Sequence, residues 1–144
     1  MKLIKKTIVF VLIFALCLST VSFAMEIAPM RASEYIRSYE PAISAKSGTV
    51  TVSFSIDGTG TMTSIGARYI YLYEISGNST TLVKTFRYTD NLYSHILGSN
   101  SRWHSSSVSY QGVSGCQYYA MVSFYAANSS GSDSALSTTR TITA

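Results

Sequence analysis

The sequence predicts an all-β fold, a single antiparallel β-sandwich of about seven strands that follows a cleaved signal peptide. Apolar residues alternate with serine and threonine over short segments, which is the pattern of half-buried strands. β-Branched and aromatic residues are abundant, whereas helical periodicity is almost absent after the leader. Turns rich in Gly, Ser and Asn separate the alternating segments, as expected for strands that pair with their neighbours.

The first 24 residues have the organisation of a secretory signal peptide. A short basic head precedes an apolar run over 7–21, and small residues follow it at Ser22 and Ala24. The run is shorter than the roughly 20 residues of a membrane span, although a retained N-terminal anchor is the alternative. We expect cleavage between Ala24 and Met25, which would give a secreted protein that no longer contacts a membrane.

Removal of the leader changes the charge balance of the chain. Lys2, Lys5 and Lys6 are lost, which leaves eight basic and seven acidic residues and a net charge of +1. The mature part has no run of Lys or Arg. A nucleic-acid partner would need a clustered basic patch, so we expect none. The remaining length suits one domain with a buried core.

The domain organisation follows from these segments. We assign 1–24 to the signal peptide, 25–46 to an N-terminal lead-in that can form an edge strand, and 47–144 to the β-sandwich. Pro41 limits pairing in the lead-in, because proline has no amide donor. Alternation predicts strands at 49–56, 67–75, 81–87, 105–111, 117–127 and 135–143. The turns that interrupt them are expected at 57–64, 76–80 and 128–133.

Alternation also assigns the two faces of each strand. The inward residues of the first and fifth of these strands are Val50, Val52, Phe54, Ile56, Tyr118, Ala120, Val122 and Phe124. The strand 67–75 is apolar on both faces, which predicts a central position. We place Ile70 and Leu72 in the core, because tyrosine tolerates a wet hydroxyl. The residues that then point outward are Tyr69, Tyr71, Tyr73, Tyr119, Met121 and Tyr125.

Residues 115–131 resemble the F–G hairpin of fibronectin type III domains. Such hairpins run from a glycine, through a tyrosine three residues on and an alternating strand, to an Asn-x-x-Gly turn. The matching positions are Gly115, Tyr118, Ala120, Val122, Phe124, Asn128 and Gly131. The resemblance implies a fibronectin type III or immunoglobulin-like sandwich. The chain departs from this family because Phe54 stands near the place of the tryptophan of the first core strand, and no Leu-x-Pro-Gly precedes the tyrosine.

The chain after the leader also resembles small secreted proteins of Gram-positive bacteria that carry a domain of unknown function. The resembling features are RASEYI at 31–36, GTGTMTSIGA at 58–67 and the terminal hairpin. This resemblance implies an exported bacterial protein and assigns no activity to it.

Residues able to carry catalysis are few. His95 and His104 are the two histidines, and the aspartates fall in predicted turns, where Asp is ordinary. The spacings typical of metal ligands or of a nucleophile elbow are absent from the sequence. We therefore predict no enzyme, no metal and no cofactor. A serine or a carboxylate pair that assembles only in the fold stays open as the basis of a hydrolase.

Cys116 is the only cysteine outside the leader, so no internal disulfide is expected. Two interpretations are open, a reactive or intermolecular thiol and a small buried hydrophobic residue. We favour the second, because no basic residue lies close in sequence to lower the pKa of the thiol.

The segment 90–107 is long for a connection between strands and contains Trp103, the only tryptophan. One hypothesis is a binding loop whose aromatic plate suits a sugar ring or a peptide. The other, which we favour, is a packed loop. In it Leu92, Ile96 and Leu97 form a helical turn over the end of the sandwich, and Trp103 plugs that end.

In a sandwich of this type the strands 67–75 and 117–127 are neighbours in one sheet, so we expect the outward tyrosines to form one aromatic patch. Such patches mark interaction surfaces, in which tyrosine is enriched. Cross-strand pairs that only stabilise the sheet are the simpler alternative. The residues proposed to contact a ligand are Tyr69, Tyr71, Tyr73, Trp103, Tyr119 and Tyr125.

These observations favour a non-catalytic extracellular binding module, whose partner would be a cell-wall glycan, a host glycan or a protein. A small secreted hydrolase is one alternative. Self-assembly through unprotected sheet edges is another, because the first and last strands lack obvious blocking charges.

Overall fold

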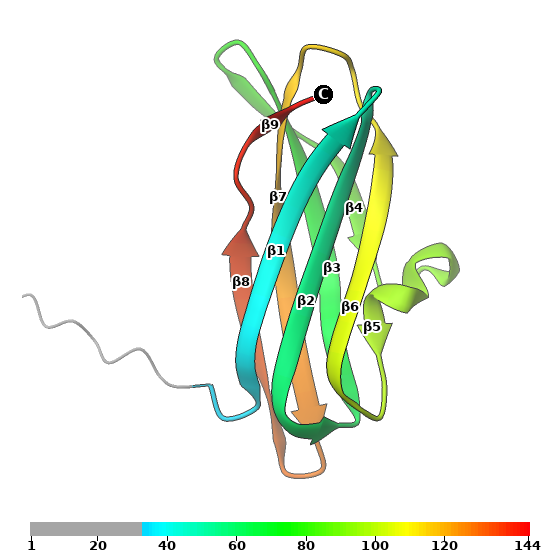
Figure 1. Cartoon of the computed structure of the whole chain (residues 1–144), viewed down its shortest axis with the longest axis vertical. Coiled ribbons are helices and arrows are strands. Elements are labelled where there is room, and N and C mark those ends of the chain that lie inside the picture. The colour runs from blue at the N-terminus through cyan, green and yellow to red at the C-terminus, as the bar shows by residue number, and fades with distance from the viewer. Residues whose placement is uncertain (1–32) are drawn as a thin grey trace, which may run out of the picture. The chain divides into compact units, whose positions relative to one another are not determined.

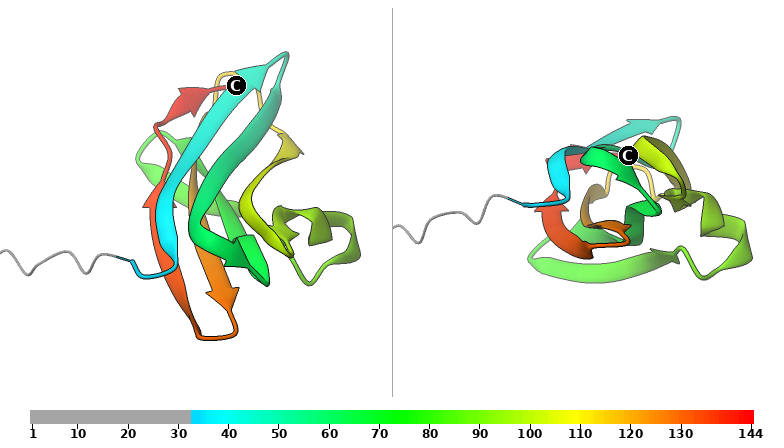
Figure 2. Two further views of the ribbon diagram at one scale, coloured as in Figure 1. Left: turned by 60° about the horizontal axis from the view of Figure 1, so that its bottom comes forward. Right: turned by 90° about the horizontal axis from the view of Figure 1, so that it is seen from below.

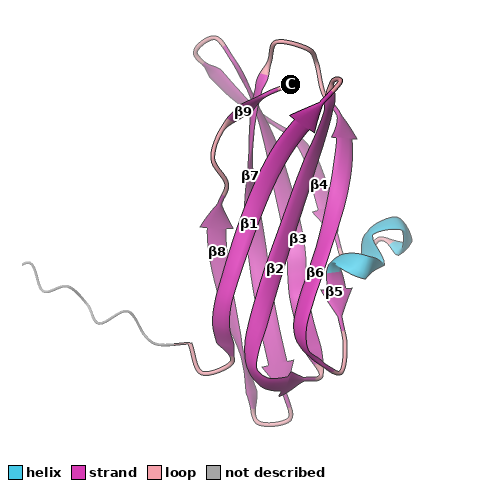
Figure 3. Cartoon of the chain, in the orientation of Figure 1, coloured by secondary structure: helices cyan, strands magenta, loops and turns pink. Residues whose placement is uncertain are grey.

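The computed structural model describes residues 33–144 (Figures 1 and 3). The predicted signal peptide and its cleavage site at Ala24 and Met25 lie outside this range. The elements are, in chain order, β1 (Ile36–Lys46), β2 (Thr49–Met62), β3 (Ser64–Ser76), β4 (Ser79–Arg87), the 3-10 turn η1 (Asn91–Ile96), β5 (Leu97–Gly98), β6 (Ser101–Gln111), β7 (Gln117–Asn128), β8 (Gly131–Thr138) and β9 (Ile142–Thr143).

The strands form two antiparallel sheets that face each other (Figure 2), which confirms the predicted all-β sandwich. One sheet has the order β1-β2-β6. The other has the order β4-β3-β7-β8, with β5 paired to β3 and β9 paired to β7. We call them the three-stranded sheet and the tyrosine sheet. The predicted central position of β3 and its pairing with β7 are both confirmed.

The core lies between the sheets and follows the predicted alternation. Inward residues of β2, β3 and β7 are almost completely buried, among them Ile70, Leu72 and Phe124 at 0% exposure. Because successive side chains of a strand point to opposite faces, the residues between them must project outward. The two sheets therefore present two outer faces, and these differ in chemistry.

The strand β1 lies within the predicted lead-in and at the edge of the three-stranded sheet. Its Pro41 stands opposite Phe54 of β2, as an edge position allows. Ile36 and Ile43 are 4% and 3% exposed and belong to the core. The packing of the sandwich thus begins before residue 47.

The turn predicted at 57–64 is wrong in its position. The strand β2 continues through this segment to Met62, which is 1% exposed and packs in the core. Its pairing with β6 shifts register between Asp57 and Met62, so the two glycines accommodate an irregularity within the strand and do not end it.

The carboxylate of Asp133 in β8 forms hydrogen bonds with the segment that precedes β1. The Oδ2 atom of Asp133 accepts hydrogen bonds from the Ser33 hydroxyl at 2.7 Å and the Tyr35 amide at 2.9 Å. These bonds, first that of Ser33 and then that of Tyr35, hold the pKa of Asp133 below its ordinary value of 3.8. The charged carboxylate is therefore favoured in the folded protein.

We expect Asp133→Asn to lower the free energy of unfolding at neutral pH by about 1 kcal/mol, because hydrogen bonds to a charged acceptor are weakened. The contribution of Asp133 should be complete above pH 4 and lost as the pH falls through its lower folded-state pKa. Urea unfolding between pH 2 and pH 7 measures both effects. Asp90→Asn is the control, since the Asp90 side chain makes no capping hydrogen bond at η1. An identical acid dependence in wild type and Asp133→Asn would refute the assignment.

Candidate functional site

The outer face of the tyrosine sheet carries five of the six residues that the sequence singled out. Tyr69, Tyr71 and Tyr73 project from β3, and Tyr119 and Tyr125 from β7. All five are partly exposed, whereas the residues that alternate with them in β7 are buried. The predicted outward direction of these tyrosines is therefore confirmed.

The register between β3 and β7 brings the tyrosines into contact. Tyr73 stands opposite Tyr119, and the two rings stack with centroids 5.0 Å apart and planes 8° apart. Tyr71 stands opposite Met121 and stacks along the strand on Tyr69, with centroids 5.9 Å apart. We call the surface formed by the following residues the aromatic face: Tyr69, Tyr71, Tyr73, Tyr119, Met121 and Tyr125.

A β-bulge adds a cation to the aromatic face. The register shifts between Ala67 and Tyr69, which leaves Arg68 as the extra residue of β3. The Arg68 guanidinium lies 4.0 Å from the centroid of the Tyr125 ring, which is a close cation–π contact. Arg68 is not among the residues that the sequence predicted for this surface. The signal available in the sequence was a break in the two-residue alternation, because apolar Ala67 is followed by apolar Ile70 three positions later.

Two exposed leucines flank the aromatic face. Leu82 of β4 stands opposite Tyr73 and is 48% exposed, while Leu136 of β8 stands opposite Ser123 and is 56% exposed. Residues that stand opposite each other in a ladder share one side of the sheet. The apolar surface therefore spans all four main strands of the tyrosine sheet. Neither leucine was singled out in the sequence, because edge strands give a weak alternation signal.

Trp103 lies on the other sheet. It belongs to β6, stands opposite Asp57 of β2 and is 64% exposed. The prediction that Trp103 plugs the end of the sandwich is wrong. The predicted helical turn does form as η1, and its Ile96 is buried, but Leu92 is 73% exposed. The six proposed contact residues thus divide between two outer faces.

The histidines have structural contacts. The Nε2 atom of His95 lies 3.2 Å from the carbonyl oxygen of Ser107, and Nε2 of His104 lies 2.9 Å from the carbonyl oxygen of His95. A carbonyl only accepts, so each ring nitrogen donates. Both rings hold η1 against β6. Cys116 is partly buried against the core, just before β7, and is unpaired within residues 33–144.

Two further features of residues 33–144 bear on possible chemistry, the grouping of metal-ligating side chains and a hollow beside β1. Within residues 33–144, His, Cys, Asp and Glu form no cluster of three able to hold a metal ion. A hollow of about 320 Å³ beside β1 is lined by Glu40, Pro41, Ala42, Ile43 and Arg140, with one carboxylate among them. In the same part of the chain, no helix is long and apolar enough to span a membrane.

The geometry defines the class of protein as an all-β sandwich with an aromatic outer face. Comparison of the chain with protein-family models, with curated proteins and with solved structures finds no match.

Proposed function

We propose that the chain is a secreted, non-catalytic binding module whose aromatic face docks on another protein. One observation carries the proposal, namely the continuous aromatic face with a leucine on either side and arginine at one end. Tyrosine and arginine are enriched at protein interfaces, and residues of these types dominate measured binding energies.

The arrangement of the rings supports a protein partner over a sugar. Tyr73 and Tyr119 stack on each other, as do Tyr69 and Tyr71, so ring faces are partly covered by neighbouring rings. Ring edges, hydroxyls and the exposed Leu82 and Leu136 remain for contact. Apolar anchors with polar tips suit a protein surface, whereas stacking on a sugar needs an open ring face.

The charges of the aromatic face also support a protein partner. Arg68 and Arg87 lie beside the tyrosines, Arg87 opposite Tyr69. Glu74 follows Tyr73 in β3, but its carboxylate accepts a hydrogen bond from the buried Tyr118 and therefore points inward. The aromatic face therefore favours a partner with an acidic rim.

We also propose that the sandwich is of the fibronectin type III or immunoglobulin-like type. In immunoglobulin sandwiches strands A, B and E share one sheet, and C, F and G share the other. The sheet order fits if β1, β2 and β6 are A, B and E, and if β3, β7 and β8 are C, F and G. The strand β4 lies beside β3, where the variable type adds a strand.

A hydrogen bond at the start of β7 supports this type. The Tyr118 hydroxyl accepts a hydrogen bond of 2.9 Å from the Val113 amide. A tyrosine near the start of strand F that bonds to backbone a few residues upstream is a hallmark of these sandwiches.

The test of the binding function is retention of extracellular proteins by immobilised domain. We expect Tyr71→Ala, at the centre of the aromatic face, to weaken retention of any specific partner about tenfold, as a residue in the middle of an interface does. Leu92→Ala is the control, because the exposed Leu92 of η1 lies outside the four strands that carry the aromatic face. Equal retention by wild type and Tyr71→Ala would refute the proposal. Retention of soluble domain by immobilised domain would identify the partner as a second copy.

A further inference from the structure

The outer face of the three-stranded sheet has a different chemistry from the aromatic face. Beyond Trp103, the outward positions of β6 are Ser105, Ser107 and Ser109. They stand opposite Ser55, Ser53 and Thr51 of β2, and the hydroxyl oxygens of Thr51 and Ser109 are 3.2 Å apart. Small hydroxyl side chains therefore cover this face in two neighbouring rows.

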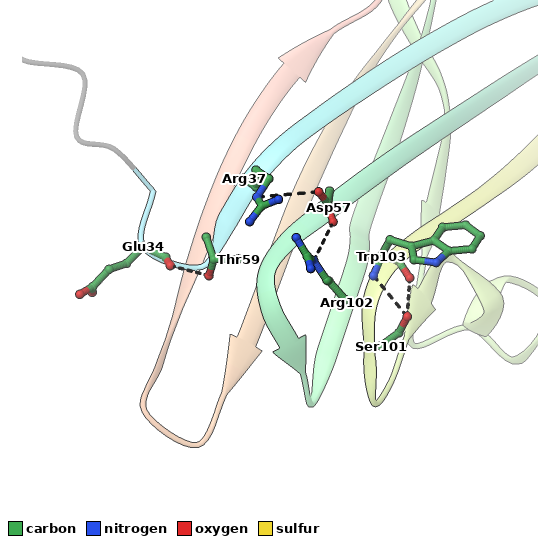
Figure 4. A network of polar contacts seen from close by, with 7 residues as sticks. All are labelled: Glu34, Arg37, Asp57, Thr59, Ser101, Arg102 and Trp103. Atoms are coloured by element: carbon green, nitrogen blue, oxygen red, sulfur yellow. Dashed lines mark hydrogen bonds and ion pairs between the residues drawn. The ribbon is translucent and has the colours of Figure 1, made fainter.

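The two rows form a shallow strip with one large side chain at its end. From Trp103 to Ser109 the strip measures about 20 Å, since an antiparallel strand rises about 3.4 Å per residue. Trp103 is 64% exposed, although tryptophan is usually largely buried. Its backbone is fixed by Ser101, whose hydroxyl donates to the Trp103 carbonyl at 2.6 Å. Figure 4 shows this contact of Ser101 with the Trp103 backbone and the indole that projects from it. In the strand, the exposed Trp103 precedes the row of hydroxyls at Ser105, Ser107 and Ser109.

Two arginines share the carboxylate of Asp57, the residue that stands opposite Trp103 in the ladder, and the indole points away from them (Figure 4). The Nε atom of Arg102 is 3.7 Å from Asp57, and that of Arg37 is 4.0 Å away (Figure 4). Both distances exceed those of hydrogen bonds, and both arginine side chains are about half exposed, at 51% and 55%. Glu34 points away from this group in the same view. The local charge is +1, and the planar fork of each guanidinium is available to a carboxylate ligand.

We propose that this strip binds an anionic polysaccharide, one whose sugar units carry carboxylates. An open indole face stacks on a sugar ring, the serine and threonine hydroxyls bond to sugar hydroxyls, and Arg102 and Arg37 pair with a uronate. We call this strip the hydroxyl strip; it consists of Arg37, Thr51, Ser53, Ser55, Asp57, Arg102, Trp103, Ser105, Ser107 and Ser109. It lies on the other sheet from the aromatic face and is independent of the proposed protein contact.

The single tryptophan of the chain makes the site directly measurable. Titration of the full mature domain with polygalacturonate should shift and quench the Trp103 emission, because a sugar replaces water on the indole. The effect should weaken strongly between 0.05 and 0.5 M salt, where exposed charges become screened. Dextran, which is neutral, should bind at least about tenfold more weakly.

Variants assign the contact to individual side chains, with affinity electrophoresis in polygalacturonate gels as the second readout. Arg102→Gln should weaken binding about tenfold, in line with the loss of one charge-assisted hydrogen bond. Trp103→Ala should abolish retardation. Both side chains are exposed, so both variants should keep the melting temperature. Arg87→Gln on the aromatic face is the charge-matched control and should bind as wild type does.

Four results would overturn the proposal. The first is an unchanged Trp103 emission with polygalacturonate. The second is an equal loss of binding in Arg87→Gln and Arg102→Gln, which would indicate attraction by net charge alone. The third is tight binding of polyglutamate, which would make the strip a site for acidic peptides. The fourth is loss of polygalacturonate binding in Tyr71→Ala, which would place the sugar on the aromatic face. Retained polygalacturonate binding in Tyr71→Ala supports the hydroxyl strip, whether or not the aromatic face binds a protein.

Discussion

Gly66→Ala is expected to destabilise the domain by about 3 kcal/mol or more. Gly66 has φ +150°, a backbone conformation that side-chain-bearing residues rarely adopt. A Cβ atom there would lie 2.3 Å from the Ile96 carbonyl oxygen and 2.9 Å from the Leu97 Cα. Both contacts are to backbone, so no rotamer change relieves them. The substitution would push η1 and β5 away from β3, where Gly66 pairs with Leu97.

Urea unfolding of the purified domain measures this effect. Gly60→Ala is the matched control, because no atom lies within 4 Å of the place that its Cβ would take and its φ is not positive. The control should change stability by less than about 1 kcal/mol. If Gly66→Ala were as stable as Gly60→Ala, the close approach of η1 to β3 would be wrong. The position of the His104 ring beside Gly66 and Gly98 would then be wrong as well.

Tyr118→Phe is expected to cost about 1 to 3 kcal/mol, and Tyr118→Ala about 3 to 5 kcal/mol. The Tyr118 side chain is fully buried, and its hydroxyl accepts from the Val113 amide and donates to the Glu74 carboxylate. Burial and then the bond to Glu74 raise the pKa of Tyr118 above 10.0. Phenylalanine keeps the ring but leaves the Val113 amide and the Glu74 carboxylate without their hydrogen-bond partner.

The control for Tyr118 is Tyr110→Phe, whose ring lies 6.3 Å away on β6 and is partly exposed. It should alter stability by less than about 0.5 kcal/mol. Because the raised pKa favours the neutral phenol in the fold, the contribution of Tyr118 should be complete below pH 10 and lost as the pH rises through its higher folded-state value. Equal stabilities of Tyr118→Phe and Tyr110→Phe would contradict the hydrogen bond that supports the proposed immunoglobulin-like type.

The alternation of residues was sufficient to predict the inward side chains in the regular parts of β2, β3 and β7. Residues such as Val52, Ile70 and Val122 are inward because a strand has a period of two, and this holds wherever a strand is regular. The pairing of β3 with β7 followed from the fold class. The aromatic face was therefore predictable in its main residues.

Irregular positions were not predictable in the same way. Asp57 to Met62 continues a strand through two glycines, and Arg68 forms a bulge, because tertiary packing compensates for locally lost pairing. The position of Trp103 depended on where β6 begins. That strand starts at Ser101 and not at 105, which puts the indole on a sheet face and not over the end of the sandwich.

The central claim, that the aromatic face contacts a protein partner, is tested most directly by site-specific photo-crosslinking. A photoreactive phenylalanine analogue is placed at Tyr71 in one variant and at Leu92 of η1 in another. Leu92 is 73% exposed, so the control position is fully accessible. Both variants are irradiated with the extracellular proteins of the producing organism, and adducts are identified by mass. The proposed contact predicts a discrete protein adduct from position 71 and none of that mass from position 92. The same adducts from both positions, or none from position 71, would contradict it.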